Sequence, residues 1–161
     1  MERNRTYMKK RLSEIDDLTG CNNRRYVHRI LRSFSDNEPI SVALLDINGF
    51  KNFNSQYYSF GDSILRGAAE MVNNYFAQFT DIYTARYGGD EFVVISKTTK
   101  KRLDFILKQF TVYAENCFTM ATHLKFDYVC GGEYLLKEWY FESIIDRLYS
   151  EIIQIKKGKA K

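Results

Sequence analysis

The segment Ile40–Ile47, with the sequence ISVALLDI, constrains the fold more than any other stretch of this chain. It is almost continuously apolar, which is the pattern of a central β-strand buried on both of its faces. Such a strand requires further elements that cover the two faces of its sheet. With 161 residues and 45% hydrophobic content, the chain is long enough to form one domain with a substantial core.

The remaining sequence supplies those further elements. Apolar residues at helical spacing predict helices at 24–35, from Gly61 onward, at 99–117 and at 139–155. Alternating apolar and polar residues predict strands at 81–87, at 92–95 and at 124–130, the last ending at Gly131 and Gly132. A turn and a short helix are expected at 48–54.

These elements predict an α/β (α+β) domain, with a mixed central sheet flanked by helices. We place this domain at residues 16–161. Residues 1–15 are charged, with apolar side chains at the spacing of an amphipathic helix, and are expected to form an N-terminal linker helix.

Asp46 stands near the carboxyl end of the apolar strand. An unpaired buried charge is strongly disfavoured, so this carboxylate needs a partner. A structural aspartate in a salt bridge is one interpretation. A metal ligand is the other, because α/β proteins commonly bind ligands at the carboxyl ends of their strands.

The heptapeptide Arg86–Phe92, RYGGDEF, lies between two strand-like runs. Gly88 and Gly89 predict a tight hairpin, since glycine adopts positive φ without a Cβ clash. Asp90 and Glu91 are adjacent carboxylates that a hairpin does not need. Glycines let an anion approach the backbone, and carboxylates beside a phosphate site usually indicate a divalent cation. Ordinary turn chemistry with a solvated glutamate is the alternative interpretation.

Charge and cysteine content restrict the class of partner. The net charge is +4, but basic residues are not gathered with aromatic ones in any nucleic-acid-binding module, so no nucleic acid is expected. The three cysteines lack metal-ligand spacing, which indicates reduced thiols in the cytoplasm. No apolar stretch approaches the length of a membrane span, so we expect no membrane contact by this domain. An upstream sensor domain is expected if the chain is a fragment of a longer protein.

Four stretches, in this order, resemble the GGDEF domain family. DDLTGCNNRR at 16–25 resembles D-x-L-T-G-L-x-N-R-R, and DINGFKNFN at 46–54 resembles D-[IV]-D-x-F-K-x-[IV]-N. GDSIL at 61–65 resembles G-D-x-[VI]-L, and residues 86–92 match R-Y-G-G-D-E-F throughout. The resemblance implies a palm-like nucleotidyl cyclase fold that contains the GGDEF hairpin. It also implies a diguanylate cyclase, which condenses two GTP into cyclic di-GMP and releases pyrophosphate.

The resemblance further implies a metal site and a catalytic set. Asp46, the Ile47 carbonyl, Asp90 and Glu91 would hold Mg²⁺ or Mn²⁺. The catalytic residues would be Glu91, Asp90 and Lys51, with Lys51 neutralising phosphate charge. Each subunit would hold one GTP, so catalysis would require a homodimer.

The implied substrate contacts are Phe50, Lys51, Asn54, Asp62, Gly88, Gly89, Lys156 and Lys159. Asn54 and Asp62 would read guanine, although Asp62 near a helix start also suits an N-cap. The glycine backbone would let the triphosphate come close. Lys156 and Lys159 would contact the γ-phosphate, with a solvated basic tail as the alternative.

The sequence departs from the family pattern beside the expected base pocket. Asn48 and Ser55 replace aspartates, the loop at 57–60 lacks a Gly-His pair and is one residue short, and the inhibitory R-x-x-D is absent near 79–82. These departures motivate an alternative: a weak or inactive GGDEF domain that binds GTP or serves as a signalling and dimerisation module. A related cyclase with another dinucleotide product is a further alternative.

Overall fold

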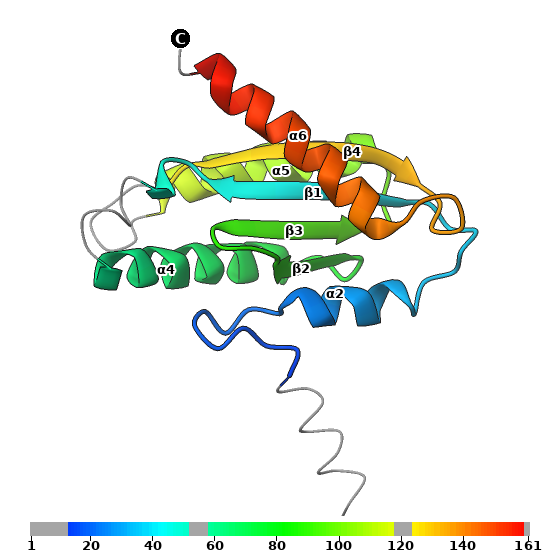
Figure 1. Ribbon diagram of the computed structural model, residues 1–161, viewed down its shortest axis with the longest axis horizontal. Helices are drawn as coiled ribbons and strands as arrows, with labels where there is room; N and C mark the ends of the chain where they lie inside the picture. The colour runs from blue at the N-terminus through cyan, green and yellow to red at the C-terminus, as the bar shows by residue number, and fades with distance from the viewer. Residues whose placement is uncertain (1–12, 52–57, 118–123, 160–161) are drawn as a thin grey trace, which may run out of the picture.

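A computed structural model describes residues 13–51, 58–117 and 124–159. Its helices and strands, in chain order, are α2 (Arg24–Leu31), β1 (Ile40–Ile47), α4 (Tyr58–Phe76), β2 (Ile82–Arg86), β3 (Glu91–Ser96), α5 (Lys100–Asn116), β4 (Phe126–Tyr134) and α6 (Phe141–Lys159). The strands form one sheet in the order β2-β3-β1-β4, with helices on both sides of it (Figure 1).

The expected fold class, a central sheet flanked by helices, is confirmed. The sheet is more uniform than the mixed sheet we predicted, because its three strand pairs are all antiparallel. Helices α4 and α5 each connect strands that run in the same direction. Another strand lies between the two strands of each such pair, so no parallel strands are neighbours.

The apolar segment forms β1 over the predicted residues, and all eight are buried. Side chains alternate between two cores, as the pleat of a strand requires. Leu45 and Ile47 pack toward α4 and α5. Val42 and Leu44 pack toward α2 and α6, and α6 crosses this face of the sheet (Figure 1).

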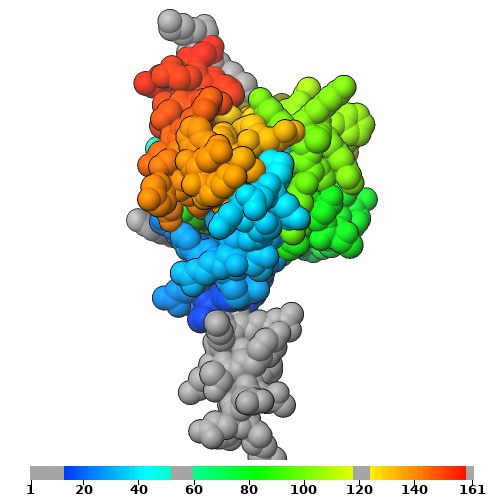
Figure 2. Space-filling model, turned by 90° about the vertical axis from the view of Figure 1, so that its right-hand side faces the viewer, coloured from blue at the N-terminus to red at the C-terminus, as the bar shows by residue number. Residues whose placement is uncertain are grey.

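Helix starts follow the capping residues of the sequence. The Asn23 side chain accepts hydrogen bonds from the backbone N–H groups of Arg25 and Tyr26, which caps α2. Helix α2 ends at Leu31 rather than near residue 35, and a tight turn follows, in which Ser33 N–H donates to the Ile30 carbonyl. The segment from α2 to β1 lies beside the chain that leads into α6 (Figure 2), and Lys137 of the β4–α6 loop donates to the Asn37 side chain.

Strand β4 does not end at the two glycines, as we predicted, but continues to Tyr134. Its register against β1 shifts by one residue there, since Ala43 pairs with Cys130 and Ser41 with Glu133. The extra residue is a β-bulge, which glycines accommodate. A Cβ on Gly131 would lie 2.5 Å from the Tyr134 hydroxyl and 3.0 Å from Leu148 of α6, so glycine also permits close helix packing.

The predicted linker helix falls mostly outside the described residues. Residues 13 and 14 form a turn, and Ile15 pairs with Asn22 in an isolated bridge. Of the turn and short helix predicted at 48–54, the structure describes a turn at 48–49 and the helical residues Phe50 and Lys51, and residues 52–54 lie outside the described residues. Within the described part of the chain, no helix is both long and apolar enough to span a bilayer.

Candidate functional site

A cavity of about 680 Å³ opens at the carboxyl end of β1. The strand end and its following turn form one wall, the β2–β3 hairpin a second, and α6 a third. Its lining residues are Asp46, Ile47, Asn48, Gly49, Phe50, Lys51, Gly89, Asp90, Glu91, Asp127, Tyr149, Ile152, Ile153 and Lys156. Residues more than 100 positions apart in the sequence therefore meet at one place.

Asp46, Asp90 and Glu91 gather in this cavity. One carboxylate oxygen from each lies within 4.8 Å of the others. The register accounts for the proximity, because Asp46 on β1 pairs with Glu91 on β3. The Ile47 N–H also donates to the Asp90 carbonyl at 3.2 Å, which fastens the hairpin turn to the strand end. The carboxylates that the two motifs supplied thus share one site.

Burial and like charge disfavour ionisation in this group. Glu91 is 9% exposed, and burial, reinforced by the charges of Asp90 and Asp46, raises its pKa to about 7. Burial also raises the pKa of Asp46, although a hydrogen bond from Lys156 opposes that shift. A cation bound among these groups would relieve their repulsion.

Lys156 of α6 supplies a positive charge at the same place. Its ammonium donates a short hydrogen bond to Asp46 Oδ1. The resemblance predicts a γ-phosphate contact for Lys156, whereas the structure pairs it with the metal-ligand candidate Asp46. Asp46 therefore has a salt-bridge partner on the same carboxylate that would bind a metal ion.

The two glycines of the hairpin differ in what they permit. Their φ angles are not positive, so the turn does not use the left-handed freedom that we predicted; within the described residues, Gly20 and Gly49 adopt such angles. A Cβ on Gly88 would lie 2.1 Å from Glu91 Oε2, so the Glu91 carboxylate rests against the Gly88 backbone. A Cβ on Gly89 would meet nothing within 4 Å, which leaves that backbone open to the cavity.

These observations fit a divalent cation. Carboxylates and a backbone carbonyl are the oxygen donors that Mg²⁺ and Mn²⁺ prefer. The ammonium already seated on Asp46 indicates that the site favours positive charge, and the space above Gly88 is kept for the Glu91 carboxylate. Asp46, Asp90 and Glu91, with the Ile47 carbonyl at the same strand end, are the groups that could hold the ion.

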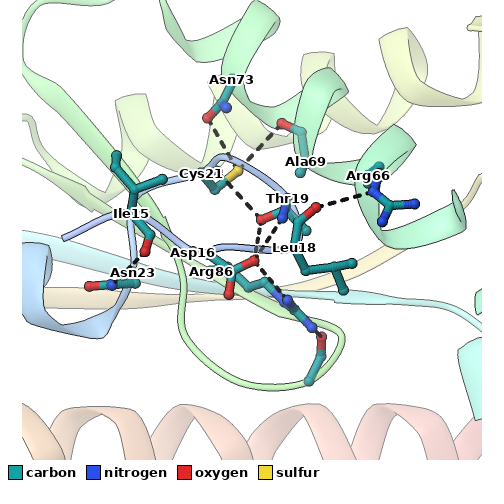
Figure 3. Close-up of polar contacts among 11 residues, drawn as sticks. Ile15, Asp16, Leu18, Thr19, Cys21, Asn23, Arg66, Ala69, Asn73 and Arg86 are labelled. Atoms are coloured by element: carbon teal, nitrogen blue, oxygen red, sulfur yellow. Dashed lines mark hydrogen bonds and ion pairs between the residues drawn. The ribbon is translucent and has the colours of Figure 1, made fainter. Parts of the chain in front are cut away.

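The hairpin is anchored by Arg86. Its Nε and Nη2 donate to the Gly89 carbonyl at 3.0 and 2.7 Å, and its Nη1 donates to Asp16 at 2.8 Å. Asp16 also accepts hydrogen bonds from the backbone and hydroxyl of Thr19, so the first motif folds against the hairpin (Figure 3). Although burial opposes it, these hydrogen bonds lower the pKa of Asp16.

Some predicted site residues are not brought into the cavity. Asp62 is exposed, lies beyond the first turn of α4 and does not line the cavity, so it is not the helix N-cap. Phe50 lines the cavity but is buried in the core beneath it. Asn54 lies outside the described residues, as does the Lys159 side chain at the end of α6. Their assignment to the substrate remains a prediction.

Asp127 on β4 is the residue of the cavity that our sequence analysis missed. It pairs with Asp46 across the β1–β4 ladder and is 6% exposed. The alternation of β4 indicated that Asp127 faces away from Phe126 and Tyr128, but the register that places it beside Asp46 depends on the fold. The apolar wall from α6 was missed for the same reason.

Comparison with known proteins decides the family. The family description "Diguanylate cyclase, GGDEF domain" matches residues 13–131 of this chain. The chain belongs to the GGDEF domain family. The resemblance carried by the four motifs is thereby confirmed, and the carboxylates of the cavity lie within the matched region.

Two curated relatives illustrate the range of this GGDEF chain's neighbours. Over 95 residues, 55% of this chain and 20% of the relative, it is 37% identical to the response regulator PleD of Caulobacter vibrioides. Over 88 residues, 51% of this chain and 24% of the relative, it is 36% identical to an uncharacterised membrane protein of Staphylococcus saprophyticus. The chain thus spans about a quarter or less of these relatives.

Solved structures support the fold. The coiled coil and GGDEF domain of DgcB from Caulobacter crescentus, in complex with c-di-GMP, superposes with a TM-score of 0.79 at 22% identity, covering 98% of this chain and 88% of that one. The FimX GGDEF domain from Pseudomonas aeruginosa superposes with a TM-score of 0.72 at 16% identity, covering 88% of this chain and 92% of that one. The palm-like cyclase architecture is therefore confirmed.

Proposed function

We propose that this GGDEF domain is a diguanylate cyclase, which condenses two GTP into cyclic di-GMP and releases pyrophosphate. The observation that carries the proposal is the convergence of Asp46, Asp90 and Glu91 on one cavity. A structural aspartate or a solvated turn would not require three carboxylates within reach of a single ion. Family membership supports the same reaction.

In this proposal Asp46, Asp90 and the Ile47 carbonyl would hold Mg²⁺ or Mn²⁺. The ion would polarise the α-phosphate and lower the pKa of the attacking 3′-hydroxyl. Glu91 would complete the metal shell or accept the hydroxyl proton.

The remaining contacts bind and orient the nucleotide. Lys51, exposed at the rim of the cavity, neutralises phosphate charge, and the open Gly89 backbone admits the triphosphate. Lys156, which lines the same cavity, leaves Asp46 for the γ-phosphate when the site is loaded. Guanine selectivity through Asn54 and Asp62 rests on the family resemblance.

The proposal includes a homodimer, because each subunit holds one GTP and the product joins two. It also includes an upstream sensor domain if the chain is a fragment of a longer protein; the curated relatives that it matches are several times longer. We place the reaction in the cytoplasm, where GTP is available and where the free cysteines Cys21, Cys117 and Cys130 would stay reduced.

The direct test is incubation of the purified chain with GTP and Mg²⁺ at high protein concentration, with the nucleotide products identified by mass spectrometry. We expect cyclic di-GMP from the wild type and none from Glu91→Gln. Glu133→Gln is the matched control, because it makes the same charge change at an exposed position at the far end of β4. Mixed GTP and ATP would reveal any other dinucleotide product.

The alternative is a GGDEF domain that binds GTP without turnover. The altered base-pocket loop at 57–60 favours it, as does the similarity over 94 residues, at 32% identity, to the cyclic di-GMP phosphodiesterase PdeR of Escherichia coli. GTP binding by calorimetry, with the nucleotide recovered unchanged, would establish this alternative and reject cyclase activity.

A further inference from the structure

The last turns of α6 carry two exposed isoleucines. Ile153 is 42% exposed and Ile155 is 40% exposed, and this end of the helix projects beyond the sheet in Figure 1. Single exposed apolar side chains are common on protein surfaces, so exposure alone does not indicate a function. Position separates the two residues, because Ile153 lines the cavity whereas Ile155 lies outside its lining.

The face of α6 that bounds the cavity changes from its inner to its outer edge. Ile152 and Ile153 each lie three or four positions from both Tyr149 and Lys156, and all four residues line the cavity. Ile152 is 2% exposed and packs in the core. Lys156 reaches inward to Asp46. Ile153 is the exposed apolar residue of this face, so the rim of the cavity at α6 is apolar.

The nucleotide bound by the same chain does not account for an apolar rim. The cavity would hold the metal ion and the triphosphate, whose charged oxygens gain nothing from contact with hydrocarbon. The apolar part of the nucleotide is its base, which the family resemblance directs to Asn54 and Asp62, and Asp62 lies outside the cavity lining. Burial of hydrocarbon stabilises protein association, so the rim fits a protein surface better than a phosphate.

A second copy of this chain is the protein that the proposed reaction brings to this place. One cyclic product joins two nucleotides, and each is held by one subunit, so the two cavities must open toward each other. The rims of the cavities are then parts of the two subunits that approach closely. In a two-fold contact both subunits use the same patch, so one substitution changes the interface twice.

We propose that Ile153 is part of the surface on which a second copy of this chain docks over the cavity. This inference rests on the proposed function, because it is the reaction between two nucleotide-bound subunits that requires a copy at this place. Ile153 acts in the association of the subunits, and not in the binding of the nucleotide or the metal ion. Its apolar character is the property that matters.

Two measurements on the full chain test this role. The first is the rate of cyclic di-GMP formation as a function of protein concentration, and the second is sedimentation velocity with Mn²⁺ and a non-hydrolysable GTP analogue. For Ile153→Gln we expect the protein concentration of half-maximal specific activity to rise about tenfold, since each dimer loses two apolar contacts. The affinity for GTP, measured where the wild type sediments as a monomer, should not change.

Two further variants separate the position of this side chain from its polarity. Ile153→Leu keeps the apolar surface and should behave as the wild type in both measurements. Ile155→Gln is the matched control, because it makes the same change on the same helix, at nearly the same exposure, outside the cavity lining. It should leave the concentration dependence and the sedimentation unchanged.

The outcomes separate this inference from the proposed function. If the wild type makes cyclic di-GMP and Ile153→Gln follows the same concentration dependence, the docking role is rejected while the cyclase proposal stands. Equal shifts from Ile153→Gln and Ile155→Gln would also reject it, because the hydrophobicity of the helix end would then be responsible. A loss of GTP affinity in Ile153→Gln would mean that the side chain contacts the nucleotide, and would overturn the inference.

Sedimentation decides the case without turnover. If the wild type binds GTP but forms no product at any concentration, the cyclase proposal fails. Association that is then lost in Ile153→Gln but kept in Ile155→Gln would support the docking surface, and association kept in both would reject it. If the wild type neither forms product nor associates, both proposals fail.

Discussion

Both faces of the sheet bury apolar side chains, but they differ at the end where the cavity opens. Toward α4 and α5, alternate residues of β1, β3 and β4 are apolar, and aromatic rings close the layer, with Phe110 centred 5.0 Å from Phe126 and 5.2 Å from Phe76. Toward α6, the same strands carry three carboxylates at the cavity end, which we call the acidic row: Asp46, Glu91 and Asp127. The first face is apolar throughout, whereas the second contains buried charge at one end.

The contrast shows that the buried carboxylates at the cavity lower the stability of the domain. Buried apolar rings contribute transfer and dispersion energy, whereas buried like charges repel and lose hydration. The acidic row is tolerated because it lies at the end of its face, where a cavity opens and Lys156 reaches in. The predictions below test this division from the largest expected effect to the smallest.

Truncation in the aromatic layer should have the largest effect on stability. Phe110 is fully buried, so Phe110→Ala is expected to lower the free energy of unfolding by about 3–5 kcal/mol. Phe105 lies on the same helix but is 62% exposed, and Phe105→Ala should change it by less than about 0.5 kcal/mol. Urea denaturation measures both, and equal losses would contradict the contribution of Phe110 to the aromatic layer.

Removal of charge from the acidic row should raise the free energy of unfolding rather than lower it. The pKa of Glu91 is raised from 4.5 to about 7, so the native state binds more protons than the unfolded state between these values. The free energy of unfolding therefore falls as pH rises through that window, by on the order of 2–3 kcal/mol for this group. Above pH 7, where Glu91 is ionised in the native state as well, the whole of this destabilisation is present.

Glu91→Gln should abolish that part of the pH dependence. In EDTA, we expect the free energy of unfolding of Glu91→Gln minus that of the wild type to be larger at pH 8 than at pH 5. Glu133→Gln, an exposed change on β4, should keep the wild-type slope. If Glu91→Gln and the wild type keep parallel stability curves over this range, Glu91 does not carry the buried charge that the comparison requires.

A third prediction concerns Asp16, a carboxylate that lies beside a cation rather than beside other carboxylates. Asp16 is paired with Arg86 at 2.8 Å, and the side chains are 25% and 12% exposed. We expect a double-mutant cycle with Asp16→Asn and Arg86→Gln to give a coupling energy of about 1–2 kcal/mol. The exposed pair Arg147 and Glu151 should give about 0.3–0.5 kcal/mol. A coupling no larger than that of the exposed pair would show that Arg86 does not anchor the hairpin through Asp16.

Much of the fold could be predicted because local patterns and tertiary structure agree. The continuous apolar run predicted β1 over its observed bounds, and the helix predicted at 24–35 begins at Arg24 as α2. The errors lie where tertiary contacts decide. Helix α4 already includes Tyr58, ahead of the predicted start at Gly61, and β4 continues past Gly131 through a bulge that the pairing with β1 sustains.

The site was predictable where one motif contains several of its residues, and not where register or a distant helix supplies them. The motifs named Asp46, Asp90 and Glu91, which the structure brings together. Asp127 was missed because its alternation gives a face but no partner; only the register against β1 places it opposite Asp46. For Lys156, the sequence placed a lysine near the chain end, but its contact with Asp46 depends on how α6 crosses the sheet.

The smallest effect, and the most specific one, is expected from Lys156. Its ammonium sits on Asp46, so a divalent cation must displace it to use that carboxylate. Lys156→Met should therefore raise the Mn²⁺ affinity of the nucleotide-free protein by about threefold to tenfold, and lower its affinity for GTP, because the triphosphate loses a cation. Lys157→Met is the matched control: the neighbouring side chain is exposed, it removes the same charge, and it does not line the cavity. Equal gains in Mn²⁺ affinity from both variants would mean that net charge alone matters. A gain confined to Lys156→Met would show that the lysine and the metal ion compete for the Asp46 carboxylate. Lys156 would then be the cation that neutralises Asp46 as long as no metal ion is bound.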